Sequence, residues 1–457
     1  MFGYALAIII AMSLVAFFVG RHQAHAIAAN APLHSRPIYH GAFVAIWVGL
    51  PSLILILLWV ALQGSVIDRL LVASLPQDMT ATASSSQIAL YMSEIKNVAS
   101  GQIFGEPSVA IREAAATYAT WDSIARWAMV VVAAAATIVG LLFARSLLGS
   151  RFRARNNFEK IITGVMIFCS IVAILTTLGI VFSLLYEAFR FFARVPVHEF
   201  LFGLRWEPQI PIRADQVAGT GAFGAVPVFT GTILIATIAM LFATPIGILS
   251  AVYLVEFAND SVRKVVKPLL EILSGVPTVV YGFFAVLTVA PAVRQFGSAM
   301  GIAVSPNSAL AAGAVMGIMI IPFISSLSDD ALKAVPRSMR DGSLAMGATV
   351  SETMTKVLIP AALPGIMGGI LLALSRAIGE TMIVVMAAGL IATLTANPLD
   401  GVTTVTVQIV TLLIGDTEFD SPKTLAAFAL GLVLFIVTLG LNVLALSIVR
   451  KYREKYD

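Results

Sequence analysis

Charged residues are what this sequence lacks most. Asp, Glu, Lys and Arg make up 12% of its 457 residues, whereas hydrophobic residues make up 59%. Soluble domains carry about 25% charged residues, so the chain is not an ordinary soluble protein. Its net charge of +4 is small for its length and gives no indication of a nucleic-acid partner. The position of each charge is therefore informative.

Motifs for catalysis and metal binding are also absent. The single cysteine, Cys169, excludes an internal disulfide, and no CxxC or Cys/His cluster is available for a metal. The dipeptide Gly-Lys never occurs, so there is no Walker A motif, and neither HExxH nor GxSxG is found. We expect no catalytic residue, metal or cofactor in this chain, and we expect Cys169 to be a small buried apolar side chain.

Long apolar runs dominate instead. Nine segments reach the length of about 18 to 20 residues that crosses a hydrocarbon layer of roughly 30 Å, and the period-two alternation of membrane β-barrels is missing. The sequence predicts an all-α, polytopic membrane protein. The predicted spans are Phe2–Gly20, Gly41–Leu62, Ile124–Phe143, Phe158–Tyr186, Val228–Val255, Pro268–Val293, Ser308–Leu327, Gly365–Ile391 and Leu425–Val449.

Basic residues follow every odd-numbered predicted span, which places these ends in the cytoplasm by the positive-inside rule. Arg21 and Arg36 follow the first span, for example, and Arg450 and Lys451 follow the ninth. The N-terminus is therefore predicted to be periplasmic and the C-terminus cytoplasmic. One outer segment disagrees, because four arginines follow the fourth span: Arg190, Arg194, Arg205 and Arg213.

Residues 1–150 are predicted to form an extension with three spans. Its outer segment, 63–122, is predicted to hold helices at Ser84–Val98 and Ser108–Trp121, separated by a break at Gly101–Pro107. We interpret this segment as a spacer, with a sensing or docking hairpin as the alternative. The first span could also be a signal peptide, but its positive charges come after the apolar run, which favours an uncleaved span.

A GxGxxG motif is formed by Gly219, Gly221 and Gly224. In a dinucleotide-binding fold this motif follows a strand and opens a helix. Here it is predicted to lie outside the cell, with no preceding strand, so we interpret it as a flexible entry to the fifth span.

Two charges lie inside the eighth predicted span, Arg376 and Glu380. A charge at the membrane centre costs about 2.5–3.5 kcal/mol on insertion scales, so such residues usually serve a function. A spacing of four predicts that both side chains lie on one helical face. They are interpreted either as part of a solute pathway, in which the arginine binds an oxyanion, or as a structural ion pair.

A third candidate pathway residue is Glu271, early in the sixth predicted span. The following Gly-Val-Pro sequence predicts an interruption of that helix, and broken helices often line solute paths in transporters. The alternative is that Glu271 forms an ion pair with Lys267, one turn away.

The segment 329–360 resembles the EAA loop of ABC-transporter membrane subunits. That loop has Glu-Ala-Ala, three residues, Gly, nine residues and Ile-x-Leu-Pro. At the same spacing this chain has the triplet Asp341, Gly342 and Ser343, then Gly347, then Pro360, although its triplet differs from the pattern. The resemblance implies that the loop contacts a separate ATPase, which would bind ATP and Mg, and Gly347 permits a turn between two helices.

Four segments resemble PstC-type permeases of phosphate ABC importers more closely: Gly231–Ala258, Ser274–Leu287, Asp330–Thr349 and Ser375–Gly389. The resemblance implies that residues 151–457 form the six-helix core of a type I importer in the bacterial inner membrane. The partners it implies are a homologous PstA-type permease, two ATP-binding subunits and an extracytoplasmic phosphate-binding protein, besides membrane lipid.

The expected function is the ATP-driven translocation of inorganic phosphate by a subunit that is not itself an enzyme. Import of another oxyanion, such as phosphonate or sulfate, stays open, because an arginine beside a carboxylate does not discriminate among them. A membrane protein that signals phosphate status and an ion channel that needs no ATPase are the alternatives from other classes.

Overall fold

A computed structural model describes residues 1–76, 85–102, 108–209, 221–414 and 420–453 of the chain. By their internal contacts the residues form two compact units, 1–175 and 176–457, which divide within the long helix α6 (Ala154–Phe192). Nine helices in the described part are long and apolar enough to cross a membrane, so the predicted number of spans is confirmed. The predicted boundary at residue 150 falls in the short connection before α6.

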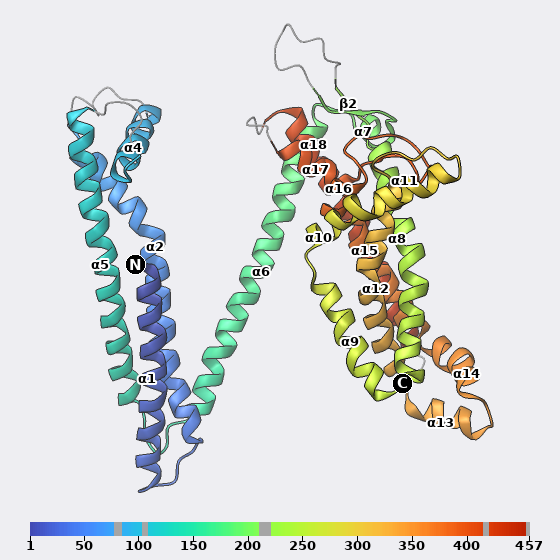
Figure 1. Ribbon diagram of the computed structural model, residues 1–457. Helices are drawn as coiled ribbons and strands as arrows, with labels where there is room; N and C mark the ends of the chain where they lie inside the picture. Colours follow the sequence, from blue (N-terminus) through green and yellow to red (C-terminus); the bar gives the residue numbers. More distant parts are fainter. Residues whose placement is uncertain (77–84, 103–107, 210–220, 415–419, 454–457) are drawn as a thin grey trace. The chain divides into compact units, whose positions relative to one another are not determined.

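The first unit is built on three long helices that lie side by side (Figure 1): α1 (Phe2–Ala28), α2 (Pro37–Ser74) and α5 (Val109–Ser146). Pro37 opens α2 at a position where a missing N–H costs nothing, and the Ser108 side chain accepts a hydrogen bond from the backbone of Ile111 at the start of α5. Gly41 lets α1 and α2 touch, since an added Cβ would lie 2.6 Å from the carbonyl oxygen of Phe17.

The insert at residues 63–122 mostly continues the long helices α2 and α5. The predicted helix Ser84–Val98 is confirmed as α4 (Ser85–Ala99). The predicted helix Ser108–Trp121 is the first part of α5, and α2 continues to Ser74 rather than ending at Leu62. Leu71, Ile95 and Ile111 bury a small apolar core between these helices. Of the predicted break, residues 103–107 lie outside the described residues.

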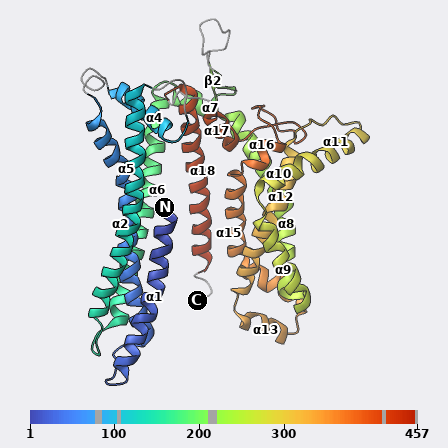
Figure 2. The ribbon, with the colours of Figure 1, turned by 60° about the vertical axis from the view of Figure 1, so that its left-hand side comes forward.

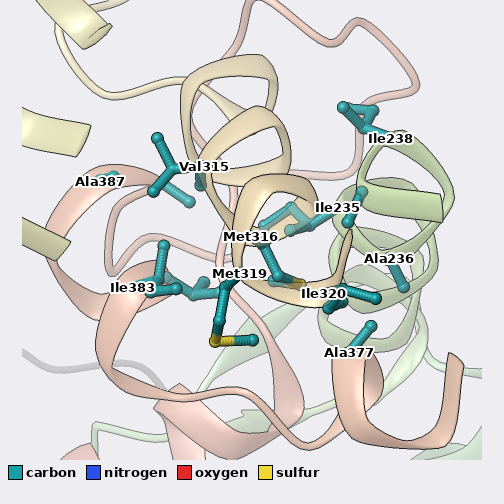
Figure 3. Packing of buried hydrophobic residues seen from close by; sticks show 14 of the residues in the cluster. Ile235, Ala236, Ile238, Val315, Met316, Met319, Ile320, Ala377, Ile383 and Ala387 are labelled. Carbon is teal, nitrogen blue, oxygen red and sulfur yellow. The ribbon is translucent and has the colours of Figure 1, made fainter. Parts of the chain in front are cut away.

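The second unit is centred on α8 (Val226–Val252) and α12 (Ala309–Lys333), which pack along their lengths (Figure 2). Figure 3 shows Ile235 of α8 near Met316 and Ile320 of α12, all of them buried. Close packing of such apolar side chains holds the two helices together. The cluster also takes in residues of α15 (Ile359–Ile378) and α16 (Met382–Ala387).

The remaining elements of the second unit are short pieces and one further long helix. They are α7 (Val197–Phe202), β1 (Trp206–Glu207), β2 (Ala222–Phe223), π-helical η1 (Tyr253–Phe257), α9 (Asp260–Gly275), α10 (Thr278–Phe284), π-helical η2 (Ala285–Val289), α11 (Ala290–Ala299), α13 (Arg337–Ala345), α14 (Val350–Thr353), π-helical η3 (Met354–Leu358), α17 (Val405–Leu413) and α18 (Pro422–Arg453).

The GxGxxG motif was predicted to be a flexible entry to the fifth span, but part of it belongs to a short strand. Gly219 lies outside the described residues, but residues 222–223 form β2, which pairs antiparallel with β1. Gly224 lies so close to the backbone of Gly203 that an added Cβ would overlap it. Gly224, the last glycine of this motif, therefore permits a tight backbone contact.

Two further predictions are wrong. Cys169 is exposed, not buried, because the apolar stretch of α6 has none of its residues buried within the chain; such a surface suits lipid or another subunit. The eighth span was predicted to run to Ile391, but α15 ends at Ile378 and a break precedes α16.

The predicted interruption of the sixth span is confirmed, since α9 ends at Gly275 and Pro277 precedes α10.

Of the four arginines that disagreed with the positive-inside rule, Arg190 and Arg194 have their charges compensated by nearby groups. Arg190 forms ion pairs with Glu187 at 2.8 Å and with Asp420 at 2.6 Å. Arg194 donates to the backbone carbonyl of Asp420 at 2.6 Å. The hydrogen bond from Arg190 also holds the pKa of the Asp420 carboxyl below its usual range. Arg213 lies outside the described residues.

Candidate functional site

Arg376 lies in the last turn of α15 and is exposed in this single chain. Its guanidinium carbon is 5.8 Å from the centre of the Phe323 ring on α12, a cation–π distance. The aromatic face attracts the guanidinium, while the side chain stays exposed. Arg376 thus places a positive charge beside the packed core of the second unit.

Glu380 does not share a helical face with Arg376, so that prediction is wrong. The helix ends at Ile378, with Gly379 as its C-cap, and Glu380 lies in the break that follows. Its Oε1 accepts hydrogen bonds from the backbone N–H groups of Met382 and Ile383, at 3.0 and 3.5 Å. The carboxylate therefore compensates the free amides at the start of α16, and no ion pair joins it to Arg376 among the described residues.

Glu271 is exposed on α9 and lines a cavity of about 180 Å³ between α9 and α12. The predicted alternative, an ion pair with Lys267, is wrong. Lys267 instead binds the Asp329 carboxylate, with Nζ 3.0 Å from Oδ2. Phe323 lines the same cavity. Phe323 therefore contacts Arg376 and also lines the cavity of Glu271, so these two residues, far apart in sequence, lie near the same ring.

Asp329 was missed as a site residue by sequence reasoning. It lies near the end of α12 with a side chain only 10% exposed, and its Oδ2 also accepts from Lys333, one turn on, at 2.6 Å. Two ammonium groups thus converge on one buried oxygen. An acid directly after an apolar run, followed by a lysine at i+4, was the available signal.

The segment 329–360 forms two helical arms joined by a turn at Gly347. The first arm is α13, none of whose residues is buried, and the turn has a positive φ of 88° at Gly347. This left-handed conformation favours glycine, so the predicted elbow is confirmed. Ser343 and Thr353 connect the arms through hydroxyls 3.0 Å apart, and a capping box between Thr349 and Glu352 opens the second arm.

The elbow presents an exposed surface and continues directly into the span with Arg376. Asp341 and Gly342 are exposed on α13, and Met346 beside the elbow is 89% exposed. Pro360 lies in the first turn of α15, where its missing N–H is tolerated. Arg376 therefore belongs to the helix that begins at the end of this segment.

A buried acid attaches α13 to the end of α8. Arg340 binds Glu256 of η1, with Nη2 2.7 Å from Oε1, and the Glu256 side chain is 3% exposed. Glu256 is the second buried carboxylate that sequence reasoning missed. The contact ties the exposed segment to the helix pair that carries the core.

Two family models match the chain. The one described as a phosphate ATP-binding cassette transporter matches residues 6–176, and the one described as a binding-protein-dependent transport system inner membrane component matches residues 243–454. The probable ABC transporter permease protein YqgH of Bacillus subtilis is 36% identical over 240 residues, which are 52% of this chain and 74% of the relative.

The phosphate transport system permease protein PstC of Mesorhizobium japonicum is 31% identical over 237 residues, covering 48% of this chain and 71% of the relative. The chain belongs to the PstC-type permease family. PstC 1 of Mycobacterium tuberculosis is 32% identical over 248 residues, covering 50% of this chain and 73% of the relative. These PstC-type relatives match about half of the chain, and the extension has a family match of its own.

Among solved structures, the inward-facing MetNI methionine ABC transporter aligns with a TM-score of 0.40 at 20% identity, covering 50% of this chain and 95% of that chain. The family assignment rests on the sequence relatives and not on this alignment. The helical, multi-span architecture agrees with an ABC importer permease.

Proposed function

We propose that this PstC-type permease carries inorganic phosphate across the bacterial inner membrane as one subunit of an ATP-driven importer. The observation that carries the proposal is the direct continuation of the exposed elbow at Gly347 into the helix that holds Arg376. Such a connection transmits a displacement of the elbow to an anion-binding group without any intervening flexible segment.

Arg376 supplies the anion contact in this proposal. A guanidinium presents several N–H donors to an oxyanion and stays charged at every physiological pH. Its contact with the Phe323 ring favours a position beside α12. Glu380 is engaged with the start of α16, so its negative charge remains near the path and keeps phosphate from binding too tightly. Glu271 adds a second negative charge at the neighbouring cavity.

The exposed segment 329–360 is the contact with a separate ATPase chain, with Asp341, Gly342, Ser343, Gly347 and Pro360 as its principal residues. ATP binding on two such chains shifts this permease between two states only if the ATPases contact the segment differently in each state. A PstA-type permease completes the pathway, and an extracytoplasmic phosphate-binding protein delivers the substrate. The N-terminus then lies in the periplasm and the C-terminus in the cytoplasm, and ATP with Mg binds only to the partner chains.

Arg376→Gln tests the pathway role. Because glutamine is polar but uncharged and shorter than arginine, we expect the assembled complex to lose phosphate uptake almost completely. The measurement is uptake of radiolabelled phosphate into vesicles that contain the complete complex, with assembly checked by co-purification of all subunits. Normal uptake by this variant would contradict the role of Arg376.

A further inference from the structure

The cavity between α9 and α12 is lined by a cluster of opposite charges. Lys267 and Lys333 both bind one oxygen of the nearly buried Asp329. Each ammonium has three N–H donors and directs one of them to this carboxylate. Ser274, Ser325 and Ser326 line the same cavity, and the Ser274 hydroxyl donates to the backbone carbonyl of Glu271 at 2.7 Å.

The charges around the cavity leave one positive charge in excess. Three cations, Arg263, Lys267 and Lys333, face two acids, Glu271 and Asp329. Arg263 is already engaged, since its Nε and Nη2 donate to the backbone carbonyls of Leu254 and Val255 at 2.8 and 2.7 Å. The two lysines are therefore the groups with donors left for a ligand, and two neighbouring ammonium groups suit an oxyanion.

The position of the cavity relates it to Arg376. Phe323 lines the cavity and also carries the Arg376 guanidinium. Asp329 and Lys333 follow Phe323 along α12 toward the exposed segment 329–360. An oxyanion that leaves Arg376 toward that segment would meet the two lysines next.

We propose that Lys267 and Lys333 form a second oxyanion site, which takes inorganic phosphate after Arg376 and before its release to the cytoplasm. Asp329 holds the two ammonium groups together when the site is empty and competes with phosphate for them, which favours release. This inference rests on the proposed function, because it assumes that phosphate passes Arg376.

The test replaces the whole arrangement without leaving an unpaired buried charge. The variant Lys267→Gln/Lys333→Gln/Asp329→Asn lowers the net charge by one, and so does the control Lys264→Gln, an exposed lysine of the same helix outside the cavity. In vesicles that contain the complete complex, we expect the triple variant to move about tenfold less radiolabelled phosphate per ATP hydrolysed, the size of one lost charge-assisted contact. The control should be unchanged.

A second variant distinguishes an oxyanion site from a purely structural role of the Lys267–Asp329–Lys333 ion pairs. Asp329→Asn keeps both ammonium groups, so it should retain clearly more transport than the triple variant. If Asp329→Asn is as impaired as the triple variant, or if the triple variant transports normally, the second site is overturned. Arg376→Gln, measured in parallel, distinguishes the failure of one proposal from the failure of the other. If Arg376→Gln loses transport and the triple variant transports normally, only the second site is overturned. If both variants transport normally, the proposed pathway is overturned as well.

Discussion

The two compact units of this chain place their ion pairs differently. In the first unit, Lys96 and Asp68 join α4 to α2 with side chains that are 41% and 36% exposed. In the second unit, the acids Glu256 and Asp329 are nearly buried and bind bases on other elements. Exposed pairs contribute little to stability, whereas a buried acid depends on its partner. The two buried acids of the second unit thus depend on partners from other elements, whereas the ion-paired acids in the described part of the first unit are at least 26% exposed.

The largest expected effect is at the elbow of the second unit. Gly347→Trp introduces strain of about 1–2 kcal/mol at a left-handed position and also a large ring on the exposed surface. We expect ATP-driven transport to be lost, because the ATPase no longer docks. Co-purification of the ATPase and the rate of ATP hydrolysis measure this. Gly347→Ala is the control: it has the strain without the ring, so it should keep the ATPase bound, and intact transport by Gly347→Trp would remove the docking assignment.

Breaking the buried pair of α13 should have the next largest effect. Arg340→Ala leaves the Glu256 carboxylate without an ion pair, at a cost of about 2–3 kcal/mol. The midpoint of thermal unfolding of the purified complex should fall, and Arg340→Ala/Glu256→Gln should regain most of the loss. The matched change in the first unit, Lys96→Ala, should cost below about 1 kcal/mol. Equal losses for Arg340→Ala and Lys96→Ala would erase the contrast between the units.

Deletion of residues 1–150 should affect transport least. The cut leaves α6 complete, since that helix begins at Ala154. Because the proposed pathway and coupling residues all lie in the second unit, phosphate uptake per assembled complex should stay near that of the full chain. Uptake assays with the shortened chain and its partners measure this. Abolished uptake in a complex that still assembles would give the extension a direct part in transport.

The sequence was sufficient for the fold class, the number of spans and the elbow. Each depends on a local signal: apolar length for the spans and a glycine between two arms for the turn at Gly347. The break after α15 was missed, because residues 379–391 are as apolar as a span and only the neighbouring elements decide where the helix ends. Glu380 was consequently placed on a helical face that it does not occupy.

The buried acids were missed for a different reason. The partners Lys267 of Asp329 and Arg340 of Glu256 lie on other elements and many residues away. Sequence spacing reveals pairs within a helix, such as Asp329 with Lys333, but not pairs between helices. The same limit explains why Glu271, a neighbour on α9, was the alternative partner considered for Lys267.

The most direct test of the account is phosphate uptake by the complete reconstituted complex, with and without ATP and with sulfate as a competitor. The account predicts uptake that requires ATP and is unaffected by excess sulfate. Uptake without ATP would indicate a channel, and strong competition by sulfate would indicate a permease for other oxyanions; either result would contradict an ATP-driven phosphate permease.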